Sequence, residues 1–238
     1  MKRYLFISLF FLISCATLKV PQEFIYAPIR ANNYVLASWQ KITDKEAPIY
    51  IYIEGDGNAF NYQGVPNKNP TPKSKFLRNM AFNDDNANVV YLARPCQFIK
   101  SDTCSVQDWT VGRFSEEIVE DTAFAIKQIA QEKEIILIGY SGGALLSGLI
   151  ISRHPEMKIN KWITIAGLLN HKDWTQYYGD MPLNLSLDLD TLPQIEQQHF
   201  VGGKDKVIPL ELSKKWINSK DLIILPNASH STVFVKIR

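Results

Sequence analysis

The stretch Ile135–Ser147 constrains the fold of this 238-residue chain more than any other. It begins with an unbroken apolar run, too short for an ordinary helix, which predicts a strand buried on both faces. The run ends at Gly139-Tyr140-Ser141-Gly142-Gly143, and small and aliphatic residues then continue as a packed helix. Glycines around a serine at such a strand-to-helix turn allow close backbone crossing on either side. The G-x-S-x-G pattern in this setting predicts Ser141 as a nucleophile.

The rest of the chain alternates strand patterns with helical ones. A helix is expected from Ser74 to about Phe82, and a second begins after Ser115, with Glu116 and Glu117 in its first turn. Strands are expected at 48–54, 88–93, 161–166, 197–201 and 222–225, besides the one before Ser141. This alternation predicts an α/β fold with a mostly parallel central sheet flanked by helices. Residues 34–42 are expected to form an antiparallel edge strand.

Length and sequence pattern predict one α/β domain, at residues 32–238, without a second full domain. The segment 168–196 is too long for a simple connection and carries several aromatic residues and leucines. We interpret it as a small cap insertion, because aromatic residues on an insertion need something to cover. A surface excursion without a covering role is the alternative.

The first fifteen residues predict export and a lipid anchor. Lys2 and Arg3 precede an apolar stretch, Tyr4–Ile13, that is too short to span a bilayer. The stretch ends in Leu12-Ile13-Ser14-Cys15, which resembles a bacterial lipoprotein signal cleaved before a lipidated cysteine. Residues 1–14 are then the signal peptide, Cys15 carries the lipid and 15–31 form a tether. The expected location is the cell envelope, at the outer membrane facing the periplasm if the cell has two membranes. A plain secretory signal and an uncleaved anchor are the alternatives.

The formal net charge is +2, and Lys2 and Arg3 account for all of it. The remaining chain has no basic excess that would predict a nucleic-acid partner. An exported protein can form disulfides, so Cys96 and Cys104 are predicted to be bridged, with two free thiols as the alternative. Glu54 and Asp56 are a weak pair of metal ligands without a third carboxylate or a histidine nearby. No metal or organic cofactor is expected.

A nucleophilic serine needs a base to take its proton and a carboxylate to orient that base. His230 follows the last expected strand, which places it at the carboxyl edge of the sheet, where Ser141 also lies. Asp205 follows the strand before it, at the same edge. We therefore predict the triad Ser141, Asp205 and His230. His171 is the alternative base and Asp173 the alternative acid.

Two backbone N–H groups must stabilise the oxyanion that forms during acyl transfer. Gly142 follows the nucleophile and supplies one of them. The loop after the strand at 48–54 should supply the second, and we assign it to Asp56. Tyr140 and the cap residues Trp174, Tyr177 and Tyr178 are weaker candidates for lining the substrate pocket.

These motifs together resemble the α/β-hydrolase superfamily, and more narrowly a group of uncharacterised bacterial exported hydrolases. The similarity spans about Ile49 to His230 and rests on the blocks Tyr52–Gly57, Tyr91–Gln97, Trp109–Thr110, Arg113–Phe114, Gly139–Gly143, Ala166–His171 and Phe200–Pro209. Glu54 stands where many members of the superfamily have histidine. The resemblance implies the fold and the triad but not the substrate, since this fold hosts many activities.

The sequence therefore predicts a serine hydrolase that cleaves a small-molecule acyl ester through an acyl-enzyme. The membrane is a partner through the N-terminal lipid, and no oligomeric state is predicted. A serine peptidase or amidase, an acyltransferase, and a non-catalytic binding lipoprotein on the same fold are the alternatives.

Overall fold

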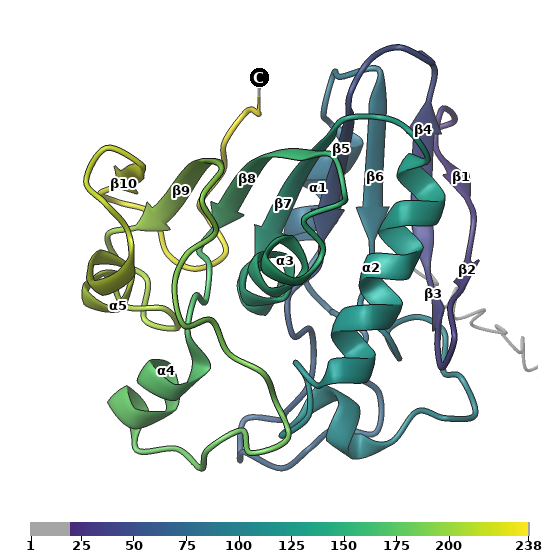
Figure 1. Cartoon of the computed structure of the whole chain (residues 1–238). Helices are drawn as coiled ribbons and strands as arrows, with labels where there is room; N and C mark the ends of the chain where they lie inside the picture. Colours follow the sequence, from purple (N-terminus) through teal and green to yellow (C-terminus); the bar gives the residue numbers. More distant parts are fainter. Residues whose placement is uncertain (1–19, 238) are drawn as a thin grey trace, which may run out of the picture.

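An eight-stranded sheet runs through the centre of the molecule in the order β1-β4-β6-β5-β7-β8-β9-β10 (Figure 1). The computed structural model describes residues 20–237, so the predicted signal peptide and Cys15 lie outside the described residues. The sheet strands are β1 (Ile25–Tyr26), β4 (Ser38–Ile42), β5 (Ile49–Ile53), β6 (Asn88–Leu92), β7 (Ile135–Tyr140), β8 (Ile159–Ile165), β9 (Glu196–Gly202) and β10 (Leu222–Leu225). A separate two-stranded sheet pairs β2 (Ile29–Arg30) with β3 (Val35–Leu36).

The six strands from β6 to β10 in the sheet order are parallel, which confirms the predicted fold class. Only the β1 and β4 end is antiparallel, with β4 paired to β6 and β1 paired to β4. Because the strands β5 to β10 all point the same way, the loops that follow them meet at one edge of the sheet. This carboxyl edge lies at the lower end of Figure 1.

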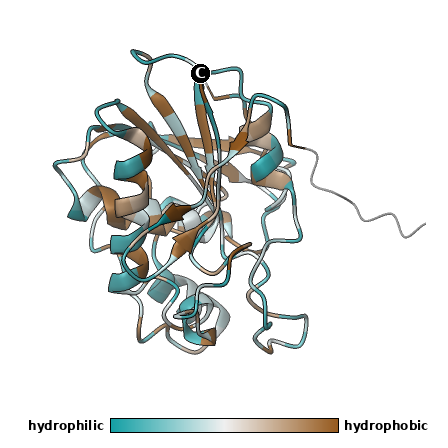
Figure 2. Cartoon of the chain, turned by 90° about the vertical axis from the view of Figure 1, so that its right-hand side faces the viewer, coloured by the Kyte–Doolittle hydropathy of each residue, from teal (hydrophilic) through white to brown (hydrophobic). Residues whose placement is uncertain are grey.

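Helices cover both faces of the sheet. The helices are α1 (Phe76–Phe82), α2 (Glu116–Ala130), α3 (Gly142–Arg153), α4 (His171–Tyr178) and α5 (Leu210–Trp216), with a 3₁₀ turn η1 at Val106–Trp109. Helices α2 and α3 pack on one face, and α1 with the C-terminal segment packs on the other. The strands between them are mostly apolar, whereas the helices alternate polar and apolar segments (Figure 2).

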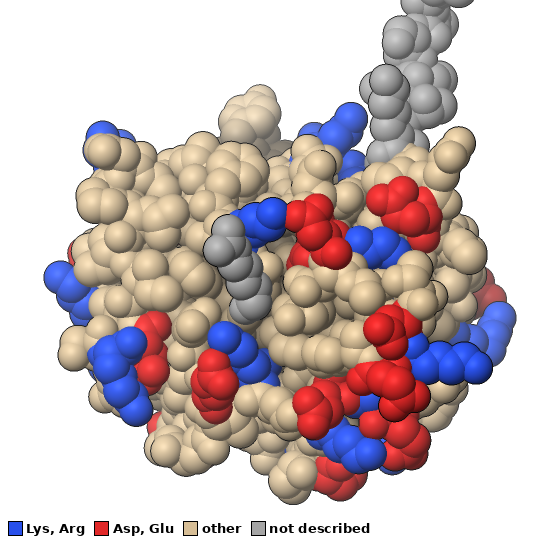
Figure 3. All heavy atoms as spheres, turned by 90° about the horizontal axis from the view of Figure 1, so that it is seen from above, with Lys and Arg blue, Asp and Glu red and all other residues tan. Residues whose placement is uncertain are grey.

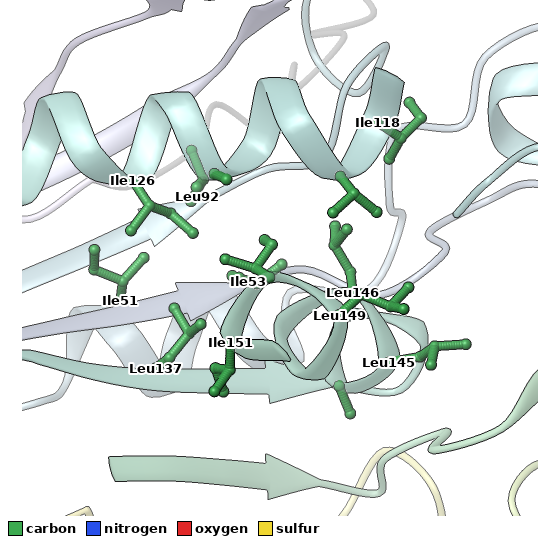
Figure 4. Close-up of a cluster of buried hydrophobic side chains, with 14 of the residues drawn as sticks. Ile51, Ile53, Leu92, Ile118, Ile126, Leu137, Leu145, Leu146, Leu149 and Ile151 are labelled. Carbon is green, nitrogen blue, oxygen red and sulfur yellow. The ribbon is translucent and has the colours of Figure 1, made fainter. Parts of the chain in front are cut away.

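The larger core cluster joins α2 and α3 to the middle strands (Figure 4). Ile118 and Ile126 of α2 belong to this cluster together with Ile53 and Leu92 of the sheet, and each of these side chains is at most 1% exposed. The predicted cap of α2 is present, because the Ser115 hydroxyl accepts a hydrogen bond from the Ile118 N–H. Burial of each such side chain contributes about 2 kcal/mol, so this face fixes the position of α3 and with it that of Ser141.

The structure corrects two expectations for the N-terminal part. The strand expected at 34–42 breaks into β3 and β4, and β4 is not the edge of the sheet because β1 pairs with its outer side. Residues 25–30, predicted as part of a tether, instead form β1 and β2, and Phe24 is buried against Phe82. The folded body therefore begins before residue 32. Within residues 20–237, no helix has the length and apolarity needed to cross a lipid bilayer.

The segment predicted as a cap contains α4 followed by irregular chain. Leu183 and Leu189 in this irregular part are buried. The side chain of Leu189 packs against Gly148 of α3, and the Leu187 N–H donates to the carbonyl of Phe114. The second half of the insertion is therefore part of the main core, and only α4 stands out from the body (Figure 1).

A buried histidine gives the fold a predictable pH dependence. His199 of β9 is enclosed between Thr164 and Gln197, and burial lowers its pKa from 6.5 to about 4. The unfolded chain therefore binds a proton at a higher pH than the folded one, so stability is lost as the pH falls from 6.5 to 4. We expect this one group to cost about 3 kcal/mol over that window. Urea unfolding at both ends of the window should show the loss in the wild type and a correspondingly smaller one in His199→Gln; equal pH dependence of the two would contradict the assignment.

Candidate active site

Ser141 lies at the turn between β7 and α3 with a φ angle of 51°. A side chain on Gly139 would come within 2.5 Å of the Ala144 Cα, and one on Gly143 within 2.4 Å of the Ile53 carbonyl oxygen. Real Cβ atoms do not approach backbone this closely, so both glycines are required by the crossing. The turn therefore places Ser141 beyond the end of β7, at the carboxyl edge of the sheet.

The structure brings the three predicted triad residues together at this edge. The Ser141 Oγ lies 3.1 Å from Nε2 of His230, and Nδ1 of His230 lies 2.8 Å from Oδ2 of Asp205. The other carboxylate oxygen of Asp205 accepts the N–H groups of Val207 and Ile208 at 2.8 and 2.9 Å. These bonds hold the carboxylate against the imidazole, which can then take a proton from Ser141.

The alternative base and acid have different partners. Asp173 accepts hydrogen bonds from the side chains of Lys215 and Trp216. The other histidines after Ser141 also contact other groups: His154 contacts Glu120 and Glu156, His171 contacts Asp188, and His199 contacts Thr164 and Gln197. Burial lowers the pKa of His171 and raises that of Asp188, which favours a neutral pair. Among the four histidines after Ser141, His230 is the one within hydrogen-bonding distance of the Ser141 hydroxyl.

The loop after β5 leaves the Asp56 N–H free, which the sequence predicts as the second oxyanion donor, and among residues 20–237 the Gly57 N–H has no partner either. The Gly55 N–H donates to Oε1 of the preceding Glu54 at 2.9 Å. Neither the Asp56 nor the Gly142 N–H has a hydrogen-bond partner among residues 20–237. A Cβ on Gly55 would lie 3.1 Å from that of Ser141, so this loop passes directly beside the nucleophile. The two free donors therefore belong to segments that flank the nucleophile.

Buried polar groups hold this oxyanion loop, Glu54–Gly57, in place. The Tyr91 hydroxyl donates to Glu54 at 2.6 Å, and the Gln97 side-chain amide donates to the Gly55 carbonyl at 2.9 Å. Glu54 is 3% exposed, and burial raises its pKa. Glu54 thus takes up the Gly55 N–H, which leaves the next N–H in the chain as the available donor.

Two arginines that the sequence analysis did not single out complete this loop. Arg94 Nη1 lies 2.5 Å from Oδ1 of Asp56, and Arg113 Nη1 lies 3.3 Å from Oδ2. Both guanidinium groups are 5% exposed, and Arg94 also lies 4.9 Å from the Phe114 ring centroid. A Cβ on Gly142 would clash with the Asp56 carboxylate. The position of Arg94 directly after a buried strand was the available signal, because parallel strands deliver such residues to the same edge.

The aromatic candidates for the pocket divide into two groups. The Tyr140 ring lies 5.2 Å from the His230 ring and therefore borders the triad. Trp174 and Tyr178 instead donate to the carbonyls of Val207 and Lys206, and Tyr177 donates to Glu211. Trp174 and Tyr178 therefore pack on the loop that carries Asp205, and Tyr177 packs on α5. The Trp174 ring also lies 5.7 Å from the Arg113 guanidinium, beside the oxyanion loop.

The predicted disulfide between Cys96 and Cys104 is present. It closes the loop after β6, which carries Arg94 and Gln97. Closing so short a loop stabilises the folded state by about 2–3 kcal/mol. Since Arg94 and Gln97 both contact the oxyanion loop, the bridge restrains the segment that positions it.

The chain has the α/β-hydrolase fold, as comparison with solved structures shows. One similar structure is XC6422 from Xanthomonas campestris, described as an α/β serine hydrolase without a lid; it is 13% identical with a TM-score of 0.56, and the match covers 89% of this chain and 88% of that one. A second is a putative hydrolase from Agrobacterium vitis, which is 12% identical with a TM-score of 0.59, and the match covers 87% of this chain and 92% of that one. The acylaminoacyl peptidase of Pyrococcus horikoshii is also similar (13%, TM-score 0.54), over 87% of this chain and 38% of that one. No protein-family model matches the chain, and no curated protein matches it in sequence. At these identities the likeness establishes the fold.

The Gln97 side chain offers a direct test of the oxyanion loop. Replacing it with alanine removes the hydrogen bond to the Gly55 carbonyl and the one from the Arg94 N–H, but no group of the triad. We expect Gln97→Ala to lower kcat for an activated ester roughly tenfold, because a misplaced oxyanion donor loses part of its stabilisation. Gln128→Ala, on the exposed face of α2, is the matched control. An unchanged kcat in the folded Gln97 variant would show that this bond does not position the loop.

Proposed function

We propose that the protein is a serine hydrolase that cleaves acyl esters through a covalent acyl-enzyme. The observation that carries this proposal is the continuous hydrogen-bonded series from Asp205 through His230 to Ser141, beside two unpartnered N–H groups. A binding protein needs no such series. The alignment of a nucleophile, a base and an orienting carboxylate is the arrangement that acyl transfer requires.

In this mechanism, Ser141 Oγ attacks the ester carbonyl carbon while His230 Nε2 takes the hydroxyl proton. The oxyanion accepts hydrogen bonds from the Gly142 and Asp56 N–H groups, each contributing about 3–4 kcal/mol of transition-state stabilisation. The intermediate collapses as the C–O bond to the alcohol breaks and His230 returns the proton to the leaving alcohol. A water molecule deprotonated by His230 then attacks the acyl-enzyme, which releases the acid and regenerates Ser141.

Asp205 keeps the imidazole in the tautomer that presents Nε2 to the serine, and it stabilises the imidazolium that forms. The Asp56 carboxylate lies close to the oxyanion position, where a bare negative charge would oppose catalysis. Arg94 and Arg113 offset this charge, so the loop can present its N–H group without an electrostatic penalty.

A fluorophosphonate probe, which reacts with activated serines, tests the nucleophile. We expect the wild type to be labelled and Ser141→Ala to remain unlabelled with an unchanged melting temperature, because the Ser141 hydroxyl has its side-chain contact with His230 alone among the described residues. His230→Gln should reduce the labelling rate by about three orders of magnitude or more. A folded wild type that does not react would support the binding-protein alternative.

The same preparation decides between ester and amide substrates. Matched p-nitrophenyl esters and p-nitroanilides of increasing acyl length are compared for kcat/KM. We expect the esters to be preferred, whereas faster anilide cleavage would favour the peptidase alternative. Product that increases with an added alcohol acceptor would favour the acyltransferase alternative.

We further propose that Cys15 is lipidated and anchors the protein in the cell envelope. The support is the sequence alone: a basic start, a short apolar stretch and a cysteine directly after Leu12-Ile13-Ser14. We expect mass spectrometry of the mature protein to find a diacylglyceryl-modified N-terminal cysteine, and Cys15→Ser to leave the membrane fraction. An unmodified N-terminus at another residue would contradict the anchor.

A further inference from the structure

The two most exposed large apolar side chains of residues 20–237 lie at the carboxyl edge of the sheet, where Ser141 also lies. Four of the loops at this edge form what we call the loop rim: residues 56–75, 95–110, 179–187 and 203–208. Other exposed apolar side chains lie outside the rim, among them Ile25 (70%) and Phe234 (61%). The most exposed apolar residues of the loop rim are Tyr62 (96% exposed), Met181 (81%), Val65 (52%), Leu185 (50%), Val106 (46%) and Val207 (44%). They come from loops after β5, β6, β8 and β9, which all end at the lower side of Figure 1.

The opposite edge of the sheet is different. Among residues 20–237, its loops at 43–48, 83–87, 131–134, 154–158 and 217–221 contain none of the large exposed apolar side chains, and Ile42 (44% exposed) lies beside them at the end of β4. Figure 3 looks down on this edge, where acidic and basic side chains are mixed. Scattered exposed apolar residues need no explanation, but the contrast between the two edges indicates that the loop rim meets an apolar partner.

The charges of the loop rim identify that partner. Its exposed charged residues are the lysines Lys68, Lys73, Lys75, Lys100, Lys204 and Lys206, against only Asp102 and Asp180. The half-buried Asp56 is paired with two arginines, and the half-buried Asp108 accepts the Ser105 N–H. The other edge exposes more acidic than basic residues, with Asp44, Glu46, Asp85, Glu132, Glu134 and Glu156.

Apolar side chains surrounded by lysines are the combination that binds an anionic lipid surface. The apolar groups enter the boundary between headgroups and acyl chains, and the lysines remain beside the phosphates. The acidic opposite edge would be repelled from the same surface, which orients the molecule. We infer that the loop rim seats the mouth of the active site on an anionic lipid bilayer, from which the ester substrate is drawn. This inference deepens the proposed function and rests on it for the substrate.

Site-specific labels on the full chain test the orientation without relying on activity. Tyr62→Cys and Met181→Cys place an environment-sensitive fluorophore on the loop rim, whereas Phe124→Cys on α2 and Ile223→Cys on β10 place it on similarly apolar sites elsewhere. The cysteines of the disulfide do not react without reductant, and the unmutated chain measures any labelling at Cys15. Vesicles consist of phosphatidylcholine with or without phosphatidylglycerol.

On the vesicles that contain phosphatidylglycerol, we expect the two rim labels to shift to the blue and to be quenched by nitroxide lipids, and the two control labels to remain in water. An N-terminal anchor alone would not select one face in this way. Exchanging Lys68, Lys73 and Lys75 for glutamine should weaken insertion of the rim labels roughly tenfold or more. The same exchange at Lys45, Lys158 and Lys220 should not.

Rim labels that are quenched no more than the control labels would overturn the inference. A blue shift without nitroxide quenching would also overturn it, since it would mean that the rim meets another macromolecule. The fluorophosphonate reaction of each variant reports separately whether the active site is intact, so a failure of the proposed function is recognised independently. In variants that still react with the fluorophosphonate, Tyr62→Ser and Met181→Ser should slow hydrolysis of a long-chain ester carried in vesicles severalfold. Hydrolysis of soluble p-nitrophenyl acetate by the same variants should be unchanged.

Discussion

The crossing of two backbone segments at the end of β7 determines the rest of the site. Gly143 must pass the carbonyl groups of Ile53 and Glu54 at a distance that excludes any side chain. This contact fixes the start of α3 directly against the end of β5. As a consequence, the serine between β7 and α3 and the loop that follows β5 are placed side by side by the sheet itself. Because both partners are backbone in a fully buried core, little adjustment is available at this point.

The loop after β5 depends on side chains for its conformation, in contrast to the turn that holds Ser141. The Gly55 N–H and C=O groups are bound by Glu54 and Gln97, and the half-buried Asp56 carboxylate by Arg94 and Arg113. Two of these four partners, Arg94 and Gln97, come from the loop directly after β6, which the disulfide closes. Buried networks of this kind are costly when one member is missing, because the remaining groups lose their partners inside the protein. The N–H group proposed as the second oxyanion donor is therefore positioned by polar groups from distant parts of the sequence.

These two kinds of constraint explain how far the sequence could be interpreted. The strand before Ser141, the helix after it and the order of Asp205 and His230 follow from local patterns and from the rule that parallel strands end at one edge. Whether β4 is the edge of the sheet depends on Ile25 and Tyr26, which pair with it as β1. A strand of two exposed residues has no alternation of polar and apolar residues by which the sequence could have predicted it. Arg94 and Arg113 were not recognised because a buried arginine is identified by its partner, and the partner is 38 residues away from Arg94.

The segment 168–196 shows the same limitation for an insertion. Its aromatic residues were interpreted as a cover because they required a surface to pack on. The surface they found is the backbone of Lys206 and Val207, next to the carboxylate that orients His230. Helix α4 thus packs on the acid loop, and its Trp174 also reaches Arg113 beside the oxyanion loop, so the insertion links the two loops that flank Ser141.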